Sequence, residues 1–155
     1  MKLRFVTGSD LVSKIIHIGE RDGWPTHVEA VMPDGRLLGA HARGGVMIRQ
    51  KGYDRDWLKK ERIIDIPVPP KVDDRFHNFL YEQIGAPYDW GAVFGLWLGH
   101  DWRDPKKWFC SELIARAEEV SGYFMPLASV VYHVSPRDLL LVHSSRIFLK
   151  GEQNG

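Results

Sequence analysis

The chain has little cysteine, with Cys110 as its one thiol in 155 residues. A lone cysteine cannot form a disulfide within the chain, and cysteine-based zinc sites require several thiolates. The composition therefore fits a reducing compartment. A chain of this length buries about two-thirds of the surface that its unfolded state exposes, so it folds without disulfides or structural metals. The length predicts one domain over residues 1–155.

An excess of charge and a long apolar run are also absent. The chain has 21 Lys and Arg residues against 20 Asp and Glu residues, which argues against nucleic acid as a partner. The most apolar run, residues 92–99, is far shorter than the roughly twenty residues of a membrane-spanning helix. The N-terminal stretch MKLRFVTGSD lacks the apolar core of a signal peptide. We expect a cytoplasmic or phage-associated protein without a transmembrane segment.

The hydrophobic pattern predicts an α+β fold, in which one small antiparallel sheet packs against helices. Strands are expected in six places: residues 3–8, three runs within 26–49, 61–69 and 145–149. Helices are expected in four places: from Ser9 or Asp10 to residue 18, from 70 to 84, from about Trp108 to Gly122, and as a short turn after Ser135.

The stretch MPDGR, residues 32–36, predicts a hairpin with a three-residue loop in which Gly35 adopts the left-handed conformation. Met32 then lies opposite Arg36. A two-residue Asp-Gly turn would instead turn His41 toward the core. With the longer loop, the strand residues expected to face the core are apolar: Val28, Ala30, Met32, Leu38 and Ala40.

The opposite face of the hairpin brings together His27, Glu29 and His41. The register pairs His27 with His41, and opposed residues have Cβ atoms about 4.5–5.5 Å apart. His41 can therefore orient His27 and fix its tautomer, as the third member of a catalytic triad does, and Glu29 is the rival for that role. A solvated polar face and a metal site on these three residues are the alternatives. No HExxH motif is present, and we predict neither a metal nor another cofactor.

Cys110 is predicted to lie in the first turn of the helix that WFCSELIARAEE, residues 108–119, forms. Unpaired N–H groups and the helix macrodipole favour a negatively charged sulfur there, which makes the thiol a nucleophile. The spacing of Cys110, Ile114 and Ala117 fits a core-facing cysteine as well. A nucleophilic cysteine needs a base. Of the 7 histidines, His27 is the best placed, at the start of a strand and therefore at the rim of the sheet.

Three stretches, WPTHVEAVMPDGRLLGAHARGGV, PYDWGAVFG and WFCSELIARA, together resemble the permuted branch of the NlpC-type papain-like cysteine hydrolases. That branch includes YiiX-like and lecithin retinol acyltransferase-like proteins, and its histidine strand precedes its cysteine helix, as His27 precedes Cys110. The resemblance covers residues 7–122 and implies a circularly permuted papain-like fold. It implies that Cys110 is the nucleophile, His27 the base and His41 the polar third residue.

The resemblance also places Tyr88, in PYDWG, beside the catalytic centre. Its hydroxyl and a backbone N–H at the start of the cysteine helix would stabilise an oxyanion. Three neighbours are further candidates for contact with the oxyanion or the substrate: Ser111, Trp90 and Trp108.

The implied reaction is cleavage of an amide bond, in a cell-wall peptide or of the γ-glutamyl type, through an acyl-thioester on Cys110. The expected partner is therefore a peptide or an acyl small molecule. The alternatives are an acyltransferase or a lipid or ester hydrolase with the same triad, and a non-catalytic phage or structural binding protein that retains the fold.

Overall fold

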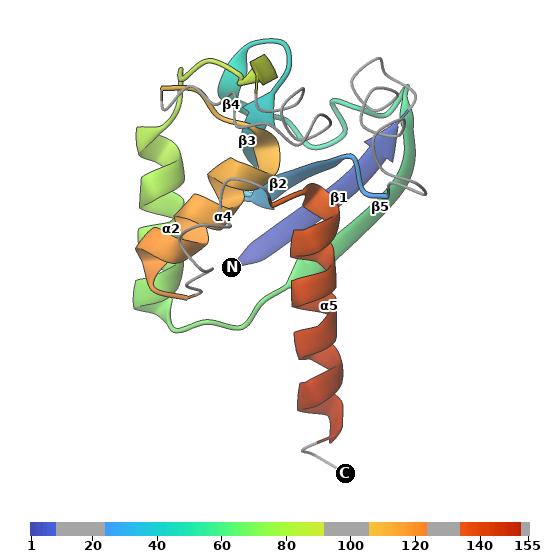
Figure 1. The fold of residues 1–155 in the computed structure, drawn as a ribbon, viewed down its shortest axis with the longest axis vertical. Helices are drawn as coiled ribbons and strands as arrows, with labels where there is room; N and C mark the ends of the chain where they lie inside the picture. Colours follow the sequence, from blue (N-terminus) through green and yellow to red (C-terminus); the bar gives the residue numbers. More distant parts are fainter. Residues whose placement is uncertain (9–23, 92–105, 124–133, 153–155) are drawn as a thin grey trace.

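The structure is a computed structural model that describes residues 1–8, 24–91, 106–123 and 134–152 (Figure 1). In the last of these ranges the side chains are described as far as Ser145. The helix predicted between Ser9 and residue 18 lies outside the described residues. No described helix combines the length and the apolar character that are needed to cross a membrane.

Within the described residues, five antiparallel strands form one sheet in the order β4-β3-β2-β1-β5. Their bounds are β1 (Lys2–Gly8), β2 (His27–Val31), β3 (Leu37–His41), β4 (Gly45–Arg49) and β5 (Leu58–Asp65). The first strand is an inner strand of the sheet, because β1 pairs with β2 on one side and with β5 on the other. The α+β class is therefore confirmed.

The hairpin of β2 and β3 has the predicted register. Ala30 pairs with Leu38, the Met32 N–H donates to the Arg36 carbonyl at 2.8 Å, and Gly35 has a φ of 83°. The residues predicted to face the core all belong to it: Val28, Ala30, Met32, Leu38 and Ala40. The three-residue loop is therefore confirmed, and the polar side of the hairpin faces away from the core.

In the described part of the chain three helices accompany the sheet: α2 (Pro70–Glu82), α4 (Cys110–Ser121) and α5 (Pro136–Glu152). Helix α4 packs on β2 and β3 and lies beside α2 (Figure 1). Its inward positions Leu113, Ile114 and Ala117 are fully buried, as their helical spacing requires. Gly122, with a φ of 80°, ends α4 where the sequence predicts.

The strand predicted at residues 145–149 is wrong, because this segment belongs to α5. Ser135 starts the helix: its hydroxyl accepts from the Asp138 N–H at 3.2 Å, and its own N–H donates to the Asp138 carboxylate at 2.9 Å. No Gly or Pro follows between residues 137 and 150, so nothing interrupts the helix. A short apolar run such as RIFL does not by itself distinguish a strand from a helix.

The second side of the sheet is covered by residues 50–57, which connect β4 to β5. Asp54 from this connection bonds Arg4 in β1 at 2.7 Å, and Tyr53 donates to Glu29 in β2 at 3.2 Å. Arg4, Glu29 and Asp54 are buried. Burial without a partner would cost free energy for each of these polar groups, so their mutual contacts decide how this side of the sheet packs.

Gly45, at the start of β4, is expected to tolerate no side chain. It has a φ of 71°, and a Cβ would lie 2.1 Å from the Ala86 carbonyl oxygen, whereas Gly35 has a φ of 83° and no neighbour within 4 Å. Gly35→Ala should cost only the left-handed backbone penalty, roughly 1–2 kcal/mol of unfolding free energy. Gly45→Ala should cost clearly more. Urea unfolding of both variants measures the difference, and equal losses would contradict the contact with Ala86.

Candidate active site

Cys110 is the first residue of α4, in agreement with the sequence prediction. Phe109 before it is extended, with φ −87° and ψ 153°, and makes no side-chain cap. The thiol therefore lies at the end of the helix where the first N–H groups lack helical acceptors and the dipole is positive. Because α4 packs on β2, this end of the helix meets the strand that carries His27.

Cys110 lies close enough to His27 to act on the pKa of its imidazole. Nε2 of His27 lies 3.6 Å from Glu29 Oε2, which leaves Nδ1 as the ring nitrogen for the thiol. Burial by itself lowers the pKa of His27, but the interactions with Cys110 and with the adjacent carboxylate of Glu29 outweigh it and raise the pKa to about 10. The surroundings of His27 therefore favour an imidazolium next to the sulfur.

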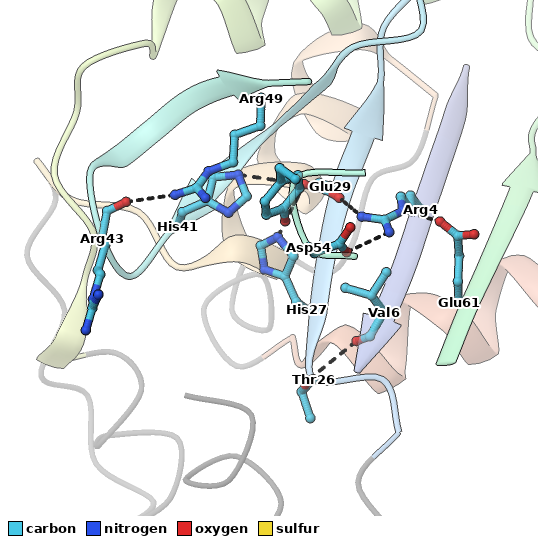
Figure 2. A network of polar contacts seen from close by, with 11 residues as sticks. Arg4, Val6, Thr26, His27, Glu29, His41, Arg43, Arg49, Asp54 and Glu61 are labelled. Carbon is cyan, nitrogen blue, oxygen red and sulfur yellow. Dashed lines mark hydrogen bonds and ion pairs between the residues drawn. The ribbon is translucent and has the colours of Figure 1, made fainter. Parts of the chain in front are cut away.

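Glu29 is completely buried and remains a carboxylate. Burial raises its pKa, but His27, His41 and Arg4 together lower it to about 2. The Arg4 guanidinium bonds Oε1 at 2.5 Å, and the Tyr53 hydroxyl donates to Oε2. Figure 2 shows Glu29 between the two histidines on one side and Arg4 on the other. The carboxylate is thus held on the side away from the thiol and directs one oxygen at the histidines.

Arg4 binds three carboxylates at once. Besides Glu29 it bonds Asp54 Oδ2 at 2.7 Å and Glu61 through Nε (Figure 2). Although burial lowers the pKa of Arg4, these partners raise it above its ordinary value. The guanidinium therefore stays charged, and it holds Glu29 through Oε1, the oxygen that does not face the histidines.

His41 is also near this carboxylate. Its Nε2 lies 3.7 Å from Glu29 Oε2, its ring centroid is 4.9 Å from that of His27, and the Tyr53 ring meets it edge-on at 5.4 Å. Burial and the positive charges of His27 and Arg49 lower the pKa of His41 to about 3. The two candidates for the third catalytic residue thus differ: Glu29 is a charged acceptor, and His41 is a neutral ring.

The aromatic candidates gather near the start of α4. Tyr88 forms an isolated parallel bridge with Trp108, and its ring lies 6.1 Å from that of Phe109, the residue before Cys110. The ring centroid of Trp90 lies 5.2 Å from that of Tyr88, and Trp90 is 39% exposed. Tyr88 is therefore close to the first turn of α4, and Trp90 presents an aromatic surface to solvent beside it.

Ser111 and Trp108 have structural partners. The buried Ser111 hydroxyl donates to the Val134 carbonyl at 2.5 Å, which ties the start of α5 to α4. The Trp108 indole N–H donates to Gln83 at 3.1 Å, at the end of α2. Ser111 follows Cys110 directly and Trp108 lies two residues before it, and the polar hydrogens of both are directed at these neighbouring elements.

The sequence pattern did not indicate the residues that hold the Glu29 carboxylate in place, which are Arg4, Tyr53 and Asp54. Arg4 pairs directly with Glu29 across β1 and β2, but this contact depends on the strand order, which the sequence pattern did not supply. Tyr53 and Asp54 lie in the connection 50–57, which has no periodic pattern. The one available signal was Arg4 itself, a charged residue between the apolar residues Leu3 and Phe5.

Within the part of the chain that the structure describes, one cluster has the residue types and spacing of a metal site. It consists of His27, Glu29 and His41, with one ligand atom of each residue lying within 4.8 Å of the others. This is the same set that the hairpin register predicts. The cluster therefore has two chemical uses, orientation of a catalytic imidazole and coordination of a cation.

Comparison with known proteins adds no relative: no protein-family model matches the chain, and no curated protein is significantly similar to it. The geometry of the site therefore has to carry the functional conclusion.

His41 should make the protein sensitive to mild acid. Folding lowers its pKa from 6.5 to about 3, so between these values the unfolded chain binds a proton that the folded chain does not. The contribution of His41 to the free energy of unfolding is therefore complete above pH 6.5 and is lost as the pH falls toward 3. His41→Gln should remove it. Urea unfolding on both sides of pH 6.5 should show a smaller acid loss for the variant; an identical loss would contradict the pKa of His41.

Proposed function

We propose that the protein is a cysteine hydrolase that cleaves an amide bond through an acyl-thioester on Cys110. One observation carries the proposal: the thiol at the start of α4 lies close enough to His27 to raise the pKa of the imidazole, and Nε2 of His27 faces the charged Glu29. A cysteine that only fills space in a core behaves as a small hydrophobe and needs no such partners. A nucleophile with a base, and a base with an orienting group, is the arrangement that acyl transfer requires.

The roles follow from the positions of the groups. His27 takes the thiol proton, and the sulfur attacks the carbonyl carbon of the substrate to form a tetrahedral intermediate. The first N–H groups of α4, together with the Tyr88 hydroxyl, stabilise its oxyanion. His27 then donates its proton to the leaving amine, the C–N bond breaks, and the acyl group remains on Cys110. Water, deprotonated by His27, releases the acid and frees the thiol.

Glu29 is assigned the orienting role and His41 an auxiliary one. A carboxylate beside Nε2 fixes the tautomer and stabilises the imidazolium that forms in each half of the reaction. His41 is neutral because its pKa is about 3, so it adds no charge and packs against the ring of His27.

The protonation of His27 supports an amide rather than an ester as the substrate. In the free protein Cys110 and Glu29 raise the pKa of His27, and the imidazolium that results can protonate the leaving nitrogen once the sulfur has attacked. An amine is a poor leaving group unless it receives a proton, whereas an alcohol depends on this step less. An acyltransferase would use the same first half-reaction and differ only in its acceptor.

The order of elements supports the family resemblance. Strand β2 with His27 precedes helix α4 with Cys110, and α4 packs on β2 in an α+β fold. This is the order expected of a permuted papain-like domain of the NlpC type. We therefore include that fold in the proposal.

Access to the thiol is a requirement of the proposal. Cys110 is completely buried, and the His27 side chain is 15% exposed, so solvent reaches the base but not the nucleophile. A substrate has to displace part of what covers Cys110. The exposed Trp90 next to Tyr88 is the proposed first contact for a peptide or acyl substrate.

Alkylation tests the dyad. Cys110 should react with iodoacetamide at neutral pH, and His27→Ala should slow the reaction by about tenfold or more, since a positioned base contributes roughly 10²–10⁴-fold. His77→Ala, which removes a histidine of α2 that bonds Asp73, is the matched control and should leave the rate unchanged. Mass spectrometry of the labelled chain measures the rates. Equal rates in the two variants would refute the dyad, and an unreactive Cys110 would refute the access to the thiol that the proposal requires.

Acyl trapping tests the reaction itself. A p-nitrophenyl acyl ester should leave one acyl group on the wild-type chain, seen by intact mass, and none on Cys110→Ser. Glu29→Gln should slow acylation by about tenfold or more, because the imidazolium loses its counter-charge. Peptide amides should then be cleaved with water as acceptor. Turnover only when an amine or alcohol acceptor is added would assign the acyltransferase class instead.

A further inference from the structure

Both histidines of the site direct a ring nitrogen at the same carboxylate oxygen. Nε2 of His27 and Nε2 of His41 lie 3.6 Å and 3.7 Å from Glu29 Oε2, and Figure 2 shows the three side chains converging. Both nitrogens are buried and lie slightly beyond hydrogen-bond distance from that oxygen, and His41 as a whole is 7% exposed. A buried polar atom without a partner is costly, so this convergence calls for a ligand that all three groups can bind.

A divalent ion of the zinc type fits these distances. Zinc binds histidine nitrogen and carboxylate oxygen at about 2.0–2.2 Å, which puts two ligands of a tetrahedral ion about 3.3 Å apart. The two nitrogen–oxygen separations slightly exceed this value. The ligand atoms of His27, Glu29 and His41 all lie within 4.8 Å of one another, so small rotations of the rings would complete the geometry. Two histidines and one carboxylate leave a fourth position open.

The charges near the cluster also favour a cation. Histidine binds metals through its neutral imidazole, and Glu29 supplies the carboxylate of the set. Arg4 opposes a cation, but it is shared among Glu29, Asp54 and Glu61. Arg49, whose charge acts on His41, also opposes one. A metal on Nε2 replaces the proton that makes His27 an imidazolium, so the two guanidinium groups then face three carboxylates and the surroundings of the ion carry an excess of negative charge.

We propose that His27, Glu29 and His41 form a binding site for a divalent transition-metal ion of the zinc type, and that the ion reversibly inhibits the hydrolase. The inference rests on the proposed function. An imidazole that holds a metal on Nε2 and a proton on Nδ1 cannot accept the proton of the Cys110 thiol. The metal therefore blocks the step that generates the nucleophile. Cys110 faces the other ring nitrogen and is not a ligand.

Cobalt(II) spectroscopy on the whole, metal-free chain tests the ligand set. Co²⁺ should bind with intense visible bands of a low-coordinate site and without a thiolate charge-transfer band, and Zn²⁺ should displace it. Cys110→Ser and His77→Ala should bind as the wild type does. His41→Ala, and the milder His41→Asn, should weaken binding by more than about tenfold. A charge-transfer band, loss of binding in Cys110→Ser, or full binding in both His41 variants would overturn the ligand set.

The alkylation assay tests the inhibition and separates the two proposals. Zn²⁺ should slow alkylation of Cys110 about tenfold or more, and a chelator should restore the rate. If Cys110 reacts with His27 as its base but Co²⁺ does not bind, the metal site is refuted and the hydrolase proposal stands. If Co²⁺ binds as predicted but metal-free Cys110 does not react, the hydrolase proposal is refuted, and with it the inhibitory role of the metal.

Discussion

The contact between Arg4 and Glu29 is the constraint on which the site depends. An ionised carboxylate that is completely buried is tolerated only when a partner compensates it, because an unpaired charge in the interior costs several kcal/mol. Arg4 compensates Glu29 and at the same time binds Asp54 and Glu61. One cation in β1 thereby ties together β2, the connection 50–57 and β5. The position of His27, and through it the chemistry of Cys110, follows from this arrangement.

Two histidines whose rings nearly touch have opposite electrostatic surroundings. Cys110 and Glu29 raise the pKa of His27 to about 10, whereas burial and the charge of His27 lower that of His41 to about 3. Environments that separate the pKa values of adjacent groups are how one site obtains both a proton carrier and a neutral partner. The same separation leaves His41 with an unprotonated nitrogen that is directed at Glu29.

The parts of the structure that local chemistry determines were predictable from the sequence. The MPDGR turn fixed the hairpin register and with it the common face of His27, Glu29 and His41, and Gly122 marked the end of the cysteine helix. The strand order is not a local property, so the partner of Glu29 in β1 could not be assigned. The C-terminal segment was wrong for a related reason. Its apolar residues suit either a strand or a helix, and the continuous helix from Pro136 decides between them.

The three-residue loop between β2 and β3 constrains how this protein can vary over evolution. Successive side chains of a strand point to opposite faces of the sheet. The length of the loop therefore decides which alternate residues of β3 face the core. Changing a loop residue leaves that assignment intact, but inserting or deleting one residue between Met32 and Arg36 exchanges the two faces. His41 would then enter the core, and Leu38 and Ala40 would take its side. Sequences that keep this site should therefore differ here in composition and not by a single residue in length.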